Sequence, residues 1–226
     1  MSKLNILGIV NNIKSKTNVF TPIVEAVVNS IDAIDQKQDG EVEIVVYREN
    51  EIEFDHKPYI KSIEIIDNGI GFSDENRESF DTYLSTTKIE IGGKGFGRFM
   101  YLKYFNDVKI KSQYQEDGVY KFRNFRFGKN DEIIVDETKG DATEKYTGTK
   151  LVLENIKEKE QLDKTLEVIA RKLVEKLLVY FVDTIFKVPQ IILREQDNSE
   201  QIILNNFIND KNPISKIGEK PITVKK

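Results

Sequence analysis

The chain has 226 residues, of which 39% are apolar and 32% charged, and its formal net charge is −4; this is typical of a folded globular protein and lacks the basic excess of a dedicated nucleic-acid-binding domain. It contains no cysteine, which excludes disulfides, thiolate chemistry, cysteine-ligated zinc and iron–sulfur clusters. The single histidine, His56, excludes a His-rich metal site and argues against a Ser-His-Asp mechanism, because it lies in a polar stretch that we expect to be a surface loop.

Two helices and two strands are predicted in the first third of the chain. Apolar side chains recur at helical spacing over 4–13. Thr21-Pro22 is a typical helix start, and the helix is predicted to run to about Gln38. Alternating patterns rich in Val and Ile predict strands over 41–48 and 60–66.

The middle of the chain combines short helices, a long loop and several strands. Ser73 is placed to cap a short helix over 74–83. The stretch 84–97 is rich in Ser, Thr, Lys and Gly without a sustained period, which predicts a mobile loop. A helix is predicted to begin near Phe96 and to carry Met100-Tyr101-Leu102. Strands are predicted over 107–115, 118–127, 131–136 and 149–153.

A long amphipathic helix is predicted over about 160–186. Its apolar stripe, which we expect to pack on a sheet, consists of Leu162, Leu166, Ile169, Leu173 and Leu177. A closing hairpin is predicted from 190–194 and 201–205, and the polar stretch 206–226 is expected to be a linker or the start of a following domain. The mixed order of elements over 1–205 favours an α+β sandwich, with helices on one face of a mostly antiparallel sheet.

No apolar run approaches the roughly 20 residues that a membrane-spanning helix needs. The N-terminal residues also lack the pattern of a secretory signal. We therefore expect a cytoplasmic protein that does not enter a membrane.

Glu25, Asn29 and Asp32 fall on one face of the second predicted helix, because 3.6 residues per turn bring these positions together. The opposite apolar stripe holds Val24, Val27, Val28 and Ile31. An amide oxygen suits Mg²⁺, and a neighbouring carboxylate can act as a general base on water. An ordinary solvated helix face produces the same pattern, so this motif alone does not establish a site.

Asp67 ends the second predicted strand and is followed by Gly69 and Gly71. Glycine permits close approach of the backbone to a ligand. The carboxylate can accept a hydrogen bond from a nucleobase amino group. Asp-Asn-Gly is also a strong turn signal, and taken alone it favours a plain turn.

A glycine-rich stretch, 92–98, opens the next predicted helix. Glycine backbone N–H groups at a helix start suit phosphate, and Lys88, Lys94 and Arg98 add positive charge. The spacing matches neither a Walker A loop nor a Rossmann fingerprint. A flexible surface loop therefore remains an equal alternative. The fourth motif, Gly148-Thr149, leads into a predicted strand and is uninformative by itself.

In combination, the order of these four motifs resembles that of the GHKL ATPases, which include gyrase B subunits, the ninety-kilodalton heat-shock chaperone, histidine kinases and MutL. The resemblance covers about residues 1–190 and implies the Bergerat fold, a two-layer α/β sandwich. The stretch from Lys94 to Lys103 looks most like bacterial ATP-binding proteins related to that chaperone and to MORC ATPases.

The resemblance implies a site for ATP or ADP with Mg²⁺. Glu25 matches the general base, Asn29 the Mg²⁺ ligand, and Asp32 supports the site through water. Asp67 matches the acceptor of the adenine amino group, and Thr149 lies near adenine through water. The other implied nucleotide-binding residues are Ala33, Gly69, Gly71, Phe72, Lys88, Gly93, Lys94, Gly95, Phe96, Gly97 and Arg98.

The resemblance implies an ATPase, weak in the isolated domain, whose lid over 84–97 closes on nucleotide and drives homodimerisation of the full-length protein or partner switching. Histidine kinases lack the glutamate at the position of Glu25, so its presence favours hydrolysis. The alternative is a non-hydrolysing nucleotide sensor that controls binding of a protein client. Relatives usually need a Lys or Arg from the following domain, and whether Lys88 or Lys94 substitutes stays open.

Overall fold

The computed structural model describes residues 5–13, 16–34, 39–50, 57–81, 97–163, 165–182 and 186–206. The elements in chain order are α1 Ile6–Asn12, α2 Phe20–Ala33, β1 Glu41–Arg48, β2 Ile60–Asp67, α3 Asp74–Asp81, α4 Phe99–Tyr104, β3 Phe105–Glu116, β4 Val119–Phe127, β5 Ile134–Asp141, β6 Gly148–Ile156, a 3₁₀ turn Lys159–Gln161, α5 Leu166–Val182, β7 Gln190–Glu195 and β8 Gln201–Ile203.

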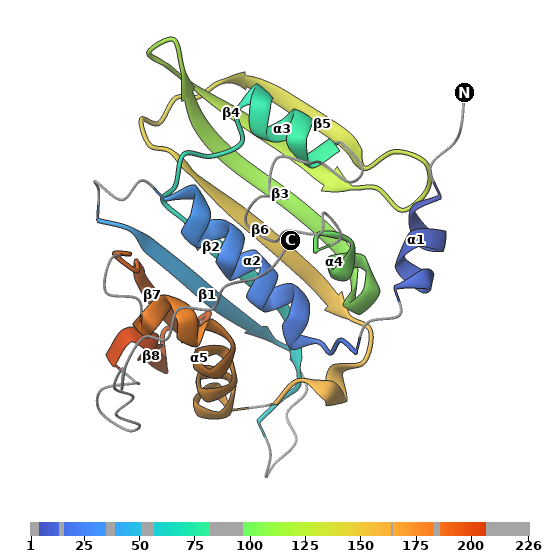
Figure 1. The fold of residues 1–226 in the computed structure, drawn as a ribbon, viewed down its shortest axis with the longest axis vertical. Helices are drawn as coiled ribbons and strands as arrows, with labels where there is room; N and C mark the ends of the chain where they lie inside the picture. The colour runs from blue at the N-terminus through green and yellow to red at the C-terminus, as the bar shows by residue number, and fades with distance from the viewer. Residues whose placement is uncertain are drawn as a thin grey trace, which may run out of the picture.

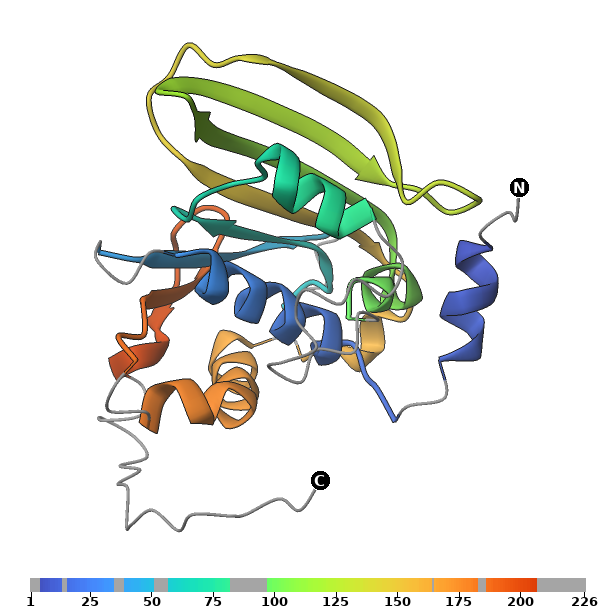
Figure 2. The ribbon, with the colours of Figure 1, turned by 45° about the horizontal axis from the view of Figure 1, so that its top comes forward.

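The strands form one eight-stranded sheet in the order β5-β4-β3-β6-β2-β1-β7-β8. Every neighbouring pair is antiparallel except β1 and β7, which run parallel. Figures 1 and 2 show α2, α3, α4 and α5 on the same face of this sheet. The predicted α+β sandwich with a mostly antiparallel sheet is therefore confirmed.

Alternation along the strands separates an apolar inner face from a polar outer face. On β2, Ile63 and Ile65 are buried beneath the helices, while Glu64 points to the other side. The outer face carries cross-strand ion pairs: Lys150 Nζ lies 3.1 Å from a Glu64 carboxylate oxygen, and Arg194 Nη2 lies 2.6 Å from one of Glu43. The apolar layer that stabilises the domain therefore lies between the sheet and the helices.

Helix α5 shows why the long apolar stripe was informative. Leu166, Ile169, Leu173 and Leu177 are all buried against the core, where each such side chain contributes about 1.5–3 kcal/mol relative to exposure. The helix nevertheless begins at Leu166 and not near 160, because residues Lys159–Gln161 form a 3₁₀ turn. Leu162, the residue that follows this turn, reaches the core without being part of α5. Within the described residues, no helix combines the length and apolar character needed to cross a bilayer.

The bounds of α2 differ from the prediction at both ends. The helix starts at Phe20, with Val19 as its N-cap residue and no side-chain cap, so Thr21 and Pro22 lie inside the first turn. Asn18 Oδ1 accepts a hydrogen bond from the Phe20 N–H at 3.1 Å. It ends at Ala33, and residues 35–38 lie outside the described part of the chain.

Other predicted elements also have shifted bounds. Strand β5 covers Ile134–Asp141 and not 131–136, because the Gly128 N–H donates to the Ile133 carbonyl at 2.8 Å and closes a turn over the first of those residues. The Ser73 cap of α3 is confirmed, with its Oγ accepting from the Asn76 N–H at 3.2 Å. Helix α4 begins at Phe99, three residues later than predicted.

Several predicted features lie outside the described residues. These are most of the loop 84–97, the residues Lys88, Gly93, Lys94, Gly95 and Phe96, the histidine His56, and the tail 207–226.

Candidate functional site

Asp67 lies buried where β2 ends beneath α2, with 8% of its surface exposed. Its Oδ1 accepts hydrogen bonds from the backbone N–H groups of Gly69 at 3.0 Å and Thr149 at 3.2 Å, and its Oδ2 accepts from Ser30 Oγ at 2.9 Å. Burial raises the pKa of Asp67 to about 6, although these three donors oppose the shift. Because a carboxylate oxygen has two lone pairs, Oδ2 keeps an acceptor position for a further donor.

The loop that follows Asp67 needs glycine because backbone from two other elements approaches it. A Cβ at Gly69 would lie 2.6 Å from the carbonyl oxygen of Ala33, at the end of α2. Gly71 has φ +76°, and a Cβ there would overlap the carbonyl of Gln113 on β3. The Ile70 N–H also donates to the Ala33 carbonyl at 2.9 Å. The two glycines of the motif therefore hold this loop between α2 and β3.

Ser112 and Arg123 fix the exit of the same loop. Ser112 Oγ accepts from the Phe72 N–H at 2.8 Å and donates to the Gly148 carbonyl at 2.9 Å. Arg123, 1% exposed, donates through Nη1 to the carbonyls of Phe72 at 3.0 Å and Ser73 at 2.7 Å. Charged donors on buried carbonyls make this a rigid connection to β3 and β4.

Glu25 lies farther along α2 toward its start and is half-buried. Its carboxylate rests against the backbone of Gly97, and a Cβ at position 97 would overlap Oε1. Gly97 is thus the one predicted lid glycine within the described residues, and its missing side chain is what gives the Glu25 carboxylate its place.

Asn29 faces α4, where Tyr101 meets it. Asn29 Nδ2 donates to the Tyr101 hydroxyl at 3.4 Å, and Tyr101 is only 3% exposed. Burial raises the pKa of Tyr101 well above its usual value, and the nearby Glu25 carboxylate raises it further. Tyr101 is therefore a neutral hydroxyl between the two predicted functional side chains of α2.

The predicted nucleotide-binding residues Asp32, Phe72 and Arg98 each have different surroundings. Asp32 is exposed, beyond Asn29 on α2. The Phe72 ring packs edge-on against Phe80 and Phe125, with centroids 5.6 and 5.5 Å apart. Arg98 donates through Nη1 to the carbonyls at the end of α3, at 3.1 Å for Ser79, so its predicted contact with phosphate stays a prediction.

Sequence reasoning missed Ser30, Ser112, Tyr101 and Arg123, which support the predicted residues. A signal was present for three of them: Ser30 interrupts the apolar face of α2, and Ser112 and Arg123 occupy inward positions of strands whose other inward residues are apolar. Tyr101 gave no such signal, because a tyrosine in an apolar run is compatible with ordinary core packing.

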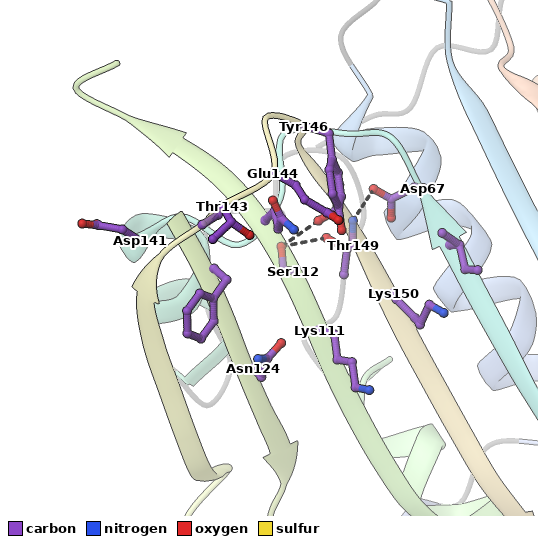
Figure 3. A pocket seen from close by; sticks show the side chains of 15 residues that line it. Asp67, Lys111, Ser112, Asn124, Asp141, Thr143, Glu144, Tyr146, Thr149 and Lys150 are labelled. Atoms are coloured by element: carbon purple, nitrogen blue, oxygen red, sulfur yellow. Dashed lines mark hydrogen bonds between the residues drawn. The ribbon is translucent and has the colours of Figure 1, made fainter. Parts of the chain in front are cut away.

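A cavity of about 580 Å³ lies over the other face of the sheet, next to Asp67 and Thr149 (Figure 3). Lys111, Asn124 and Lys150 line it, and these positions alternate with inward residues such as Ile110 and Leu151. None of its lining residues comes from α2. The polar side chains Glu25 and Asn29 therefore lie apart from this cavity, on the helix that covers the opposite face of the sheet.

Among the described residues there is no group of three or more His, Cys, Asp or Glu side chains placed to hold a metal ion. A single amide oxygen is nevertheless compatible with Mg²⁺ that is held mainly by phosphates and water. The donor set that Glu25 and Asn29 provide, one carboxylate and one amide, fits that kind of site and no site made of protein ligands alone.

Residues 17–129 match the family model described as Histidine kinase-, DNA gyrase B-, and HSP90-like ATPase. The chain belongs to this family. The matched region contains Glu25, Asn29, Asp67 and Gly97, and ATP binding is the property that the family implies. The match establishes the GHKL superfamily without selecting one of its branches. No curated protein matches the chain.

Proposed function

We propose that this domain binds ATP with Mg²⁺ between α2, the end of β2 and the start of β6, and that it hydrolyses the terminal phosphoanhydride bond. The observation that carries the proposal is the order of contacts along α2: Ala33 touches the glycine loop, Ser30 holds Asp67, Asn29 meets α4, and Glu25 meets Gly97. At 1.5 Å rise per residue, Ala33 and Glu25 are about 12 Å apart along the axis. That span suits adenine at Asp67 and phosphates near Glu25.

Each end of this span has the chemistry for its part of the nucleotide. Asp67 Oδ2 accepts from the adenine amino group, while the loop 69–72, in which Gly69 and Gly71 are buried, provides the pocket wall. The Glu25 carboxylate takes a proton from water as the water oxygen attacks the γ-phosphorus and the bond to the β–γ bridging oxygen breaks. Bound Mg²⁺ would neutralise phosphate charge, with Asn29 Oδ1 as its protein ligand.

Calorimetry with ADP, ATP and GTP tests the binding part of this proposal. Adenine presents an amino donor where guanine presents a carbonyl oxygen, and a carbonyl facing Asp67 Oδ2 would leave two acceptors opposed. We expect adenine nucleotides to bind at least ~10²-fold more tightly than GTP, the discrimination typical of a mismatched buried polar group. Equal affinities would remove Asp67 from base recognition.

The same proposal includes a nucleotide-gated segment at 84–97 and dimerisation or partner switching in the full-length protein. Its support is the glycine and lysine content of the segment and the position of Gly97 beside Glu25. Ordering a glycine-rich segment costs conformational entropy that a triphosphate can offset. We expect hydrogen exchange across 84–97 to be fastest in the nucleotide-free protein, slower with ADP and slowest with a non-hydrolysable ATP analogue. Equal exchange in all three states would contradict gating.

The second candidate function is a nucleotide sensor that binds ATP without hydrolysing it. The half-buried Glu25 favours hydrolysis, because a sensor has no need for a carboxylate at the phosphate end of the site. Turnover measurements on the full-length protein separate the two functions.

A further inference from the structure

Tyr101 brings a polar atom to a place where core packing alone needs none. Its helix neighbours Phe99, Met100 and Leu102 are all buried, and they fill the core with apolar atoms. A phenylalanine at position 101 would do the same, without the cost of about 1–3 kcal/mol for a buried hydroxyl that lacks a partner. The hydroxyl does have a partner, the Asn29 side chain on α2.

The direction of this hydrogen bond decides what it does to Asn29. A side-chain amide has a donor end, Nδ2, and an acceptor end, Oδ1. Because Nδ2 donates to Tyr101 at 3.4 Å, the acceptor end Oδ1 is not the atom that the hydroxyl engages. Oxygen is the atom that a magnesium ion requires.

We propose that Tyr101 is a positioning residue whose hydroxyl holds the Asn29 amide with its oxygen toward the cation of a bound Mg-nucleotide. This inference rests on the proposed function. Groups that orient a metal ligand contribute by restricting the ligand to its productive rotamer, and their loss typically costs ~10–100-fold in metal affinity.

Tyr104 supplies a matched control on the same helix. Its hydroxyl lies 2.8 Å from Thr17 Oγ1, outside the group formed by Glu25 and Asn29. Tyr101→Phe and Tyr104→Phe each remove one oxygen from a ring that keeps its packing. They therefore differ mainly in which hydrogen bond is lost.

The experiment measures ADP affinity by calorimetry in Mg²⁺ and in EDTA, and the ratio of the two affinities is the magnesium coupling. We expect Tyr101→Phe to reduce the coupling about tenfold or more while the affinity in EDTA stays at the wild-type value. Tyr104→Phe should leave both quantities unchanged. Wild-type coupling in Tyr101→Phe would overturn the inference.

Asn29→Ala separates failure of this inference from failure of the proposed function. If Asn29→Ala abolishes the coupling and Tyr101→Phe does not, the metal site stands and the positioning role is wrong. If Asn29→Ala leaves the coupling intact, the metal role of Asn29 and the inference both fall. When Tyr101→Phe is added to Asn29→Ala, the magnesium coupling should not fall further. An additional loss of coupling would show that Tyr101 acts on the metal by another route.

A second readout needs neither metal nor nucleotide. In the free protein, the side-chain amide NMR signals of Asn29 should shift in Tyr101→Phe and stay in place in Tyr104→Phe, because only the first change removes the acceptor of Nδ2. Unchanged Asn29 signals in Tyr101→Phe would contradict the hydrogen bond itself. Thermal unfolding of both variants shows whether either change disturbs the fold.

Discussion

Replacing Asp67 by asparagine is expected to abolish most adenine-nucleotide binding while making the folded domain more stable at neutral pH. The backbone N–H groups of Gly69 and Thr149 both donate to Oδ1, so an asparagine would place its own oxygen there. Its NH₂ group would then stand where Oδ2 is, donating to Ser30 Oγ and facing the adenine amino group. Two donors would be opposed across this contact, which leaves a buried polar group unpaired.

The gain in stability follows from the pKa of Asp67. Burial raises the pKa from 3.8 to about 6, so between these values the folded state binds more protons than the unfolded state. The free energy of unfolding therefore falls as pH rises from about 4 to about 6, by on the order of 3 kcal/mol for a shift of about two units. Asparagine carries no charge, so Asp67→Asn should lose this decline.

Urea unfolding of wild type and Asp67→Asn across pH 4–7, with ADP calorimetry at neutral pH, measures both effects. The stability difference should grow in favour of Asp67→Asn as pH rises through this range. Asp107→Asn is a control: the hydrogen bond from Lys129 lowers the pKa of Asp107 below 3.8, so this carboxylate stabilises the fold throughout pH 4–7, and its loss should reduce stability by a nearly constant amount over that range. A variant that binds ADP like wild type would exclude the proposed contact with adenine.

The pattern of the sequence was sufficient where one segment determines its own structure. The strand that ends at Asp67 and the stripe of α5 depend on local alternation and on helical period, and both are found as predicted. The end of α2 and the start of α5 depend on what packs against them, so periodicity extended each helix too far. Tertiary contacts overrule the local signal at such boundaries.

Which groups the supporting residues of the candidate site contact could not be predicted from the sequence, for the same reason. Asp67 stands out in the sequence because it precedes two glycines, whereas Ser30 is 37 residues away and meets Asp67 only when α2 lies on the sheet. Tyr101 meets Asn29 across 72 residues. The motifs thus predict which groups act on a ligand, and the fold is needed to identify the groups that hold them.

Glu25→Ala is expected to keep nucleotide binding and lose hydrolysis in the full-length protein. Loss of a general base typically costs ~10²–10⁴-fold in rate. Glu25 lies at the far end of α2 from Asp67, the proposed adenine contact, so ADP affinity should change little. Steady-state phosphate release and ADP calorimetry measure the two effects, and the nucleotide sensor predicts equal, negligible release from wild type and variant.

Gly97→Ala tests whether the position of the Glu25 carboxylate matters as well as its presence. The new methyl group would take the place of Oε1, and because a carboxylate is the mobile end of its side chain, Glu25 would shift while the backbone stays. A displacement of about 1 Å can cost roughly 10²-fold in rate, so we expect Gly97→Ala to bind ADP normally and to release phosphate slowly. In the Glu25→Ala background the same change should cause no further loss, because the carboxylate it displaces is already gone. A full additional loss in the double variant would mean that Gly97 acts on the phosphates directly, and that Glu25 is not positioned by it.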